Sequence, residues 1–269
     1  MIINSGSEPL ISIIMNCYNG EKYLHDSLKS IINQTYENWE LVFWDNLSKD
    51  FSKRILFKFS DKRIKYFKSK KFLNLYEARN AAIEKSTGDY IAFLDTDDLW
   101  TPDKLEKQVN FFKNNPESKI VYSNYFNLES CKDFKYKKYK KILPSGFVTQ
   151  ALLDDYKIGI LTVLLEKNIF KTKKFNNEYN IVGDFDFFIK SSIEFKIDSI
   201  EEPLAYYRIH SSNFLYKNKK NYISELSNWI SSNQKKLLEL GFSLKKLKIL
   251  LFKQKIKYML NKYFRFNLR

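Results

Sequence analysis

Cysteine, histidine, proline and glycine are all scarce in this 269-residue sequence, which contains two Cys, two His, five Pro and seven Gly. Cys17 and Cys131 are far apart and lack the spacing of a metal or redox motif, so we expect ordinary thiols in a reducing compartment. No apolar run reaches the length of a transmembrane helix, and the N-terminal residues do not resemble a secretory leader. We therefore expect a cytoplasmic protein that does not span a membrane.

Acidic residues are outnumbered, because 46 Lys and Arg stand against 31 Asp and Glu, a formal charge of +15. The excess is concentrated in residues 235–269, where Glu239 is the one acid and apolar residues are interleaved with lysines. Such a segment predicts either a helix on an anionic membrane surface, at the inner face of the cell membrane, or a helical hairpin packed on the protein body. The same helices are also candidates for a homodimer interface.

A second basic cluster occupies residues 132–141, and we expect it to be a mobile loop. No nucleic-acid recognition motif accompanies either basic segment. We therefore expect no nucleic-acid partner.

Apolar runs of strand length alternate with helical patterns through the first 124 residues. Strands are expected at 10–16, 40–44, 64–67, 90–94 and 119–124, and helices at 24–34, 51–59, 75–86 and 102–114. This alternation predicts an α/β fold with a parallel sheet covered on both faces. In such sheets, ligands lie beyond the carboxyl ends of the strands.

The alternation is lost after about residue 127, which suggests a smaller region that completes a cleft. Near the C-terminus, residues 224–240 and 243–264 have the pattern of two helices separated by Gly241. The expected organisation is a main domain at 1–215, followed by a basic amphipathic helical region at 216–269.

The fourth predicted strand runs directly into an acidic turn made of Asp95, Thr96, Asp97 and Asp98. Alternate side chains of an extended segment share a face, so Asp95 and Asp97 can point together into a crevice while Thr96 points away. Such carboxylates can hold Mg²⁺ or Mn²⁺, and diphosphate oxygens commonly complete the coordination shell. The alternative is a helix N-terminus with Asp98 or Thr101 as its cap.

Seven short motifs occur in an order that resembles the family 2 glycosyltransferases of the GT-A fold, in their inverting, non-processive bacterial form. The motifs are NCYNG at 16–20, SIINQ at 30–34, WDN at 44–46, ARNA at 78–81, GDYIAFLDTDD at 88–98, GDFD at 183–186 and PLAYYRIH at 203–210. The resemblance implies a Rossmann-like nucleotide-binding sheet flanked by helices, a mixed sheet that completes the acceptor side and a C-terminal helical extension.

For the donor, the resemblance implies a nucleotide-sugar, with a UDP-sugar as the default. The residues that it assigns to nucleotide binding are Asn16, Tyr18, Asp45, Asn46, Arg79, Asp95 and Thr96. Of these, Tyr18 and Asp45 would flank the base and Asp95 would reach the ribose. Many relatives carry an acid where this chain has Asn46, so the hydrogen bonds to the base edge are expected to differ. The alternative for Arg79 is a solvated helix arginine.

For the chemistry, the resemblance implies Asp97 as a ligand of Mn²⁺ or Mg²⁺ and His210 as a second metal or diphosphate contact. Asp184 would be the base that takes the proton of the acceptor hydroxyl, so that displacement inverts the anomeric centre. Gly183 stands where relatives often carry an acid, which leaves Asp184 without that partner. The alternatives are a structural hydrogen bond for His210 and a helix-capping role for Asp186.

The resemblance predicts a hexosyltransferase-type enzyme that transfers a single sugar per encounter, because the motif of the processive synthases is absent. The expected acceptor is a hydroxyl of a bacterial surface glycan, as in lipopolysaccharide or capsule biosynthesis, or of a lipid-linked oligosaccharide. The alternatives are a nucleotidyltransferase of related fold and a non-catalytic basic module that binds glycans or polyanions.

Overall fold

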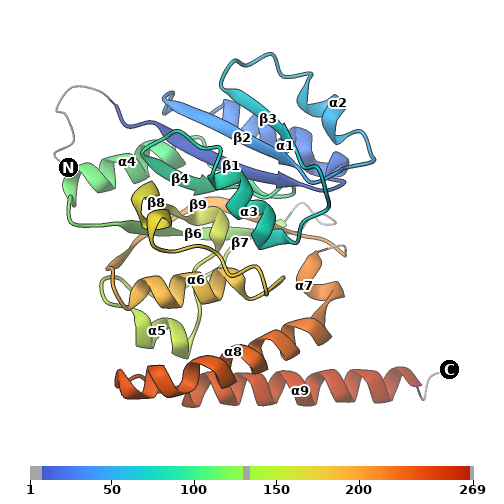
Figure 1. Cartoon of the computed structure of the whole chain (residues 1–269), viewed down its shortest axis with the longest axis vertical. Helices are drawn as coiled ribbons and strands as arrows, with labels where there is room; N and C mark the ends of the chain where they lie inside the picture. Colours follow the sequence, from blue (N-terminus) through green and yellow to red (C-terminus); the bar gives the residue numbers. More distant parts are fainter. Residues whose placement is uncertain (1–7, 130–133, 212, 267–269) are drawn as a thin grey trace.

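The computed structural model describes residues 8–129, 134–211 and 213–266, so Cys131 and the first two residues of the predicted basic loop lie outside the described residues. One mixed sheet runs through these residues, with helices packed against it (Figure 1). Two further helices lie beneath this body, at the end where the C-terminus is found.

The first four strands form the parallel half of the sheet. They are β1 (Ile11–Cys17), β2 (Trp39–Asp45), β3 (Ile64–Lys68) and β4 (Tyr90–Phe93), in the order β3-β2-β1-β4. Helices α1 (Glu21–Ile32), α2 (Ser52–Leu56) and α3 (Leu75–Ile83) connect them. Every side chain of β2 is buried, as expected for a strand with both faces covered. Because the four strands are parallel, the acidic turn after β4 lies at the same edge as the ends of β1 and β2.

Strands of both directions make up the other half. Antiparallel β8 (Leu164–Glu166) lies between β4 and β6 (Ile120–Glu129), and the order continues through β9 (Ile197–Ile209) to β5 (Leu99–Trp100). β8 is antiparallel to both β4 and β6, so the strands predicted from residues 10–124 all run in one direction, as expected, but a strand from later in the chain separates β4 from β6. The prediction of a mobile loop is wrong for β7 (Phe134–Lys137), which pairs with β6.

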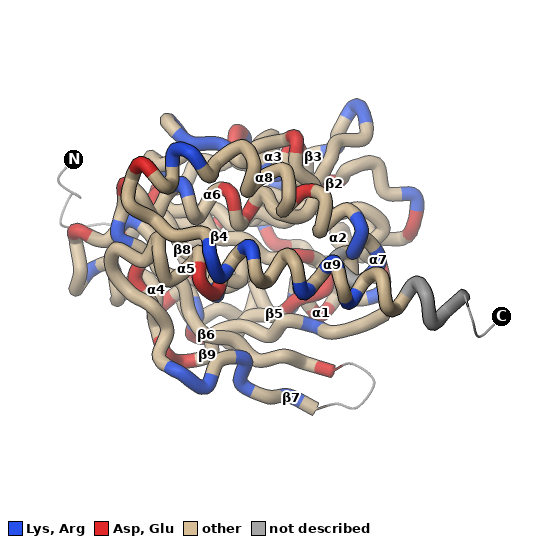
Figure 2. Tube along the Cα trace, turned by 90° about the horizontal axis from the view of Figure 1, so that it is seen from below, with Lys and Arg blue, Asp and Glu red and all other residues tan. Residues whose placement is uncertain are grey.

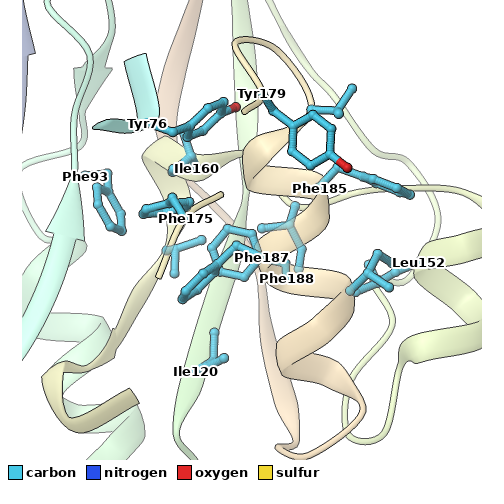
Figure 3. Close-up of a cluster of buried hydrophobic side chains, with 14 of the residues drawn as sticks. Tyr76, Phe93, Ile120, Leu152, Ile160, Phe175, Tyr179, Phe185, Phe187 and Phe188 are labelled. Carbon is cyan, nitrogen blue, oxygen red and sulfur yellow. The ribbon is translucent and has the colours of Figure 1, made fainter. Parts of the chain in front are cut away.

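An aromatic core fills the space between β4, α3 and α6 (Gly183–Ser192), as Figure 3 shows. The ring centroid of Phe175 lies 4.5 Å from that of Phe187 and 5.7 Å from that of Phe93. Helices α4 (Lys104–Asn114) and α5 (Thr149–Asp154) and the 3-10 turns η1 (Ile160–Thr162) and η2 (Lys167–Lys171) complete this half. α4 begins at Lys104 without a side-chain cap, so the prediction of Asp98 or Thr101 as its cap is wrong.

The C-terminal helices are α7 (Phe214–Lys217), α8 (Lys219–Glu239) and α9 (Lys245–Phe266). Gly241, in the left-handed region at φ +84, separates α8 from α9 as predicted. Ile223, Leu226 and Trp229 of α8 belong to the same buried cluster as the side chains of α3 and α6. α8 therefore packs into the core of the main body, and the division at residues 215 and 216 stays a prediction. None of the helices traced in residues 8–266 has the length and apolar character needed to cross a membrane.

Candidate functional site

A cavity of about 540 Å³ lies beyond the carboxyl end of β4. Its carboxylates are Asp95, Asp97, Asp98, Asp154, Asp155 and Asp184, and its apolar lining includes Leu153, Phe185, Leu226, Leu247 and Leu250. The acidic turn, the start of α6 and the two C-terminal helices thus contribute to one cavity. Its volume falls within the range of small-molecule sites.

Arg79 of α3 provides a fixed positive charge at this cavity. Its side chain is 3% exposed, and its Nη2 lies 2.8 Å from Oδ1 of Asp95, which is 37% exposed. The alternative of a solvated arginine is therefore wrong. A guanidinium has five N–H donors, so Arg79 keeps donors for a second anionic group such as a diphosphate.

Asp97 and His210 converge, with Oδ2 of the carboxylate 2.9 Å from Nε2 of the imidazole. Burial, and next the charge of Asp95, raises the pKa of Asp97. Both side chains are of types that bind divalent cations. No group of three or more His, Cys, Asp or Glu side chains suited to a metal is found in the part of the chain that the structure describes. The donor set therefore fits a cation that takes its remaining ligands from a diphosphate and water.

Asp98 ties the acidic turn to β9. It is 2% exposed, and its Oδ1 accepts the backbone N–H of Arg208 at 2.9 Å. In return, Nε of Arg208 donates to the carbonyl oxygen of Asp97 at 2.8 Å. Burial, with the charges of Asp97 and Asp95, raises the pKa of Asp98 well above its usual range. These reciprocal bonds fix the direction in which the two preceding carboxylates point.

Asp184 lies in the first turn of α6, where the helix dipole favours a negative charge. Its Oδ1 accepts the hydroxyl of Tyr76 at 3.2 Å and the backbone N–H of Phe185 at 2.8 Å. Burial raises the pKa of Asp184, and the charge of Arg79 opposes this effect. A carboxylate with a raised pKa is a stronger base, which suits proton abstraction near neutral pH.

Gly183 makes room for the partner of Asp184. A Cβ at this position would lie 2.5 Å from ring atoms of Tyr76, a distance that would force the ring to move. The absence of a side chain at Gly183 thus allows the hydroxyl of Tyr76 to reach Asp184. Figure 3 shows the Tyr76 ring beside the start of α6.

α8 holds the N-terminal end of α6 in position. The carboxylate of Glu225 accepts the backbone N–H groups of residues 180–182 at 3.0, 2.8 and 3.1 Å. Nε1 of Trp229 donates to Oδ1 of Asp186 at 2.7 Å. Asp186 therefore lies inside α6 and links it to α8, so the prediction that Asp186 caps the helix is wrong.

Asn16, Tyr18 and Thr96 lie outside the cavity lining. Tyr18 is 51% exposed, and its ring centroid is 4.9 Å from that of Phe72. Both polar atoms of the Asn16 amide are buried without a hydrogen-bond partner in the described residues, an arrangement that favours a binding position. Thr96 faces Gly20, where an added Cβ would come within 2.9 Å of its hydroxyl oxygen, so Thr96 points away from the cavity as predicted.

Asp45 and Asn46 support the loops at the ends of β1 and β2. Asp45 accepts the backbone N–H of Ser48 at 2.7 Å and the hydroxyl of Tyr66 at 2.8 Å. Asn46 exchanges two hydrogen bonds with the backbone of Leu73, at 2.8 and 3.1 Å. A direct contact of either residue with a nucleotide base stays a prediction.

Tyr76, Tyr156 and Glu225 were not expected at the site. The hydroxyl of Tyr156 is buried in the cavity lining and has no hydrogen-bond partner among the described residues. Burial, and next the charge of Asp184, raises the pKa of Tyr156 well above its usual range, so the phenol stays protonated and can donate. Tyr76 could have been anticipated, because it precedes Arg79 by three positions on one helix. The other two belong to no motif of the sequence.

Known proteins share both sequence and fold with this chain. The family model described as "Glycosyl transferase family 2" matches residues 12–189. The Escherichia coli protein UDP-Glc:alpha-D-GlcNAc-diphosphoundecaprenol beta-1,3-glucosyltransferase WfgD is 36% identical over 160 residues, which are 60% of this chain and 61% of that protein.

Two solved structures have a similar fold. S. aureus TarS 1-349 in complex with UDP-GlcNAc gives a TM-score of 0.68 and 18% identity, over 80% of this chain and 64% of that chain. Mannosyltransferase PcManGT from Pyrobaculum calidifontis, in complex with GDP-Man and Mn²⁺, gives a TM-score of 0.61 and 14% identity, over 84% of this chain and 65% of that chain. This chain thus spans less than two thirds of the length of each of the three proteins. The predicted GT-A fold and enzyme class are confirmed, and the chain belongs to glycosyl transferase family 2.

Proposed function

We propose that the chain is a metal-dependent, inverting glycosyltransferase that moves one sugar from a nucleotide-diphosphate donor, by default a UDP-sugar, to a hydroxyl of a surface glycan or lipid-linked oligosaccharide. One observation carries the proposal. Asp95 and Asp97 line the same cavity as Asp184, although the two segments are about ninety residues apart in the sequence. A diphosphate site and a base for the acceptor therefore face a common space.

Asp97 and His210 would hold the cation, and Asp95 with Arg79 would contact the nucleotide beside it. A bound Mn²⁺ or Mg²⁺ would neutralise the charge of the departing diphosphate. Imidazole is a less usual ligand for Mg²⁺ than carboxylate oxygen, so His210 favours Mn²⁺. The Mn²⁺ of the Pyrobaculum calidifontis mannosyltransferase complex supports this choice.

Asp184 would accept the proton of the acceptor hydroxyl as that oxygen bonds to the anomeric carbon. The bond between this carbon and the diphosphate oxygen breaks in the same step, and its electron pair leaves with the nucleotide diphosphate. Attack opposite to the leaving group inverts the anomeric centre. The hydrogen bond from Tyr76 and the N-terminus of α6 hold the Asp184 carboxylate for this proton transfer.

The apolar part of the cavity lining suits an acceptor that carries a lipid. Leu226 of α8 and Leu247 of α9 lie on the side of the cavity that the C-terminal helices form. The Escherichia coli relative is named for an acceptor on diphosphoundecaprenol, which supports a lipid-linked acceptor here.

Two variants test the proposal. Asp97→Asn should abolish the thermal stabilisation that a nucleotide diphosphate gives with Mn²⁺, which at about 100 times its dissociation constant is roughly 2.7 kcal/mol. Asp184→Asn should keep that stabilisation but lower sugar transfer by about 100-fold or more. Glu84→Gln is the matched control, since its carboxylate is 64% exposed and pairs with Lys174 on the surface.

The alternatives predict other results. A nucleotidyltransferase would release diphosphate from a nucleoside triphosphate and a sugar phosphate. A basic binding module would show no turnover of any nucleotide-sugar, with Asp97→Asn and Asp184→Asn indistinguishable from the unmodified protein. Either result would overturn the proposal.

A further inference from the structure

α9 has two opposite apolar faces. Leu247 and Leu251 are buried against the body of the protein. On the far side, Ile249, Phe252, Ile256, Met259 and Leu260 are 44%, 64%, 37%, 60% and 51% exposed. With about 100° between successive residues, these five side chains fall within an arc of about 100°. Single exposed apolar residues are ordinary, but a continuous stripe indicates a contact surface.

Lysines flank this stripe along both edges. On the same helical wheel, Lys248 and Lys255 lie on one edge, and Lys246, Lys253 and Lys257 lie on the other. All five are exposed. Figure 2 shows α9 running across one face of the molecule with basic positions along its length. The sequence from residue 245 to residue 269 contains no acidic residue.

The charge of the flanks decides between two occupants of the stripe. Ile249, Phe252, Ile256 and Met259 also have the spacing of a coiled-coil seam, which a second copy of the chain could fill. In that dimer, however, lysine rows would face lysine rows, whereas paired helices are stabilised by opposite charges beside the seam. An anionic lipid surface supplies both the apolar layer and the opposite charge.

We propose that α9 lies in the plane of an anionic membrane surface, with its exposed apolar stripe inserted between the lipids and its lysines at the headgroups. This inference rests on the proposed function only where it concerns the acceptor. Leu247 and Leu250 of α9 also line the cavity that contains Asp184. Because α9 is roughly 10–12 Å across, docking would hold the cavity on its inner side about that far from the membrane surface, where a lipid-linked acceptor resides.

Vesicle co-sedimentation of the full chain tests the docking surface. The unmodified protein should bind vesicles of phosphatidylglycerol and phosphatidylcholine, bind pure phosphatidylcholine poorly, and dissociate as salt is raised. Phe252→Ser with Ile256→Ser, and separately Lys253→Glu with Lys257→Glu, should each weaken binding roughly tenfold or more. Phe51→Ser is the matched control, because Phe51 is 63% exposed but lies beside α2. Equal binding to neutral and anionic vesicles, or no effect of the α9 variants, would overturn the inference.

Two further measurements distinguish membrane docking from dimerisation and from the proposed sugar-transfer activity. Analytical ultracentrifugation of the unmodified protein should show no dimer that depends on the stripe. A dimer that dissociates in the Phe252→Ser, Ile256→Ser variant would instead assign the stripe to a second copy of the chain. Sugar transfer to a short water-soluble acceptor should be unchanged in the α9 variants, while transfer to a vesicle-embedded acceptor falls. If the unmodified protein bound anionic vesicles but transferred no sugar to either acceptor, the proposed function would be refuted and the docking surface would not.

Discussion

Replacement of Tyr156 by phenylalanine should raise or preserve stability and yet lower activity. The variant removes only a hydroxyl, which is buried and lacks a partner among the described residues. The ring is retained, and its centroid stays 5.2 Å from that of Phe185, in an edge-on contact. We expect the hydroxyl to form a hydrogen bond with a sugar bound in the cavity beside Asp184. The bound sugar would thus supply the partner that this hydroxyl lacks among the described residues.

The magnitudes follow from the cost of an unpaired hydroxyl. Burial of a polar group without a partner costs about 1–3 kcal/mol, so its removal should leave the free energy of unfolding unchanged or raise it by about 1 kcal/mol. For a chain of this size, that gain corresponds to an increase of roughly 2–4 °C in Tm. A neutral hydrogen bond contributes about 0.5–1.5 kcal/mol, so kcat/KM for the acceptor should fall about 2- to 10-fold.

The assay combines thermal unfolding of the ligand-free protein with the initial rate of sugar transfer. Tyr122→Phe serves as the control, because its hydroxyl donates to the carbonyl oxygen of Pro144 at 2.7 Å and lies outside the cavity lining. That variant should lose about 1 kcal/mol of stability and keep its activity. If Tyr156→Phe instead unfolded more easily and transferred sugar at the normal rate, the hydroxyl would be structural and our reasoning would be refuted.

Two further predictions concern residues that support the site, and a third concerns the buried amine of Lys104 in α4. Glu225→Gln should destabilise the protein by about 1–3 kcal/mol in thermal unfolding and slow sugar transfer, because the backbone N–H groups of residues 180–182 lose the carboxylate that accepts them. Full activity of this variant would contradict the supporting role of Glu225. Gly183→Ala should cost about 1–3 kcal/mol by displacing the Tyr76 ring, and an unchanged Tm would contradict the close contact. Burial lowers the pKa of Lys104 well below its usual range, whereas the unfolded chain binds that proton up to about pH 10.4. The free energy of unfolding should therefore rise with pH between the lowered pKa of Lys104 in the folded protein and that value, and Lys104→Met should remove this contribution in denaturant titrations across pH, most visibly by stabilising the protein at low pH.

Much of the nucleotide-binding half could be predicted because its signals are local. β1, β2 and β4 are short, mostly apolar runs, and α1 has apolar residues at helical spacing. The order of the motifs then placed Arg79, Asp95 and Asp97 at one edge of the sheet, and the structure brings all three to the cavity.

The acceptor half was harder to predict because its contacts join distant segments. β8 enters the sheet between β4 and β6 and begins 35 residues after the end of β6, and no local pattern marks that insertion. Asp186 has the spacing of a helix cap, but α6 starts three residues earlier, at Gly183, so that Asp186 lies inside the helix and contacts Trp229 of α8.

The sequence by itself determined the fold class, the acidic turn and the basic, apolar character of the C-terminal helices, because these depend on residue type and spacing along one segment. Only the tertiary structure decided which side chains meet. It paired Asp97 with His210 across the sheet, left the Tyr156 hydroxyl without a partner, and buried one apolar face of α9 while it exposed the other. Such outcomes depend on how far-separated segments pack, since burial and hydrogen bonding are properties of the assembled core rather than of any local pattern.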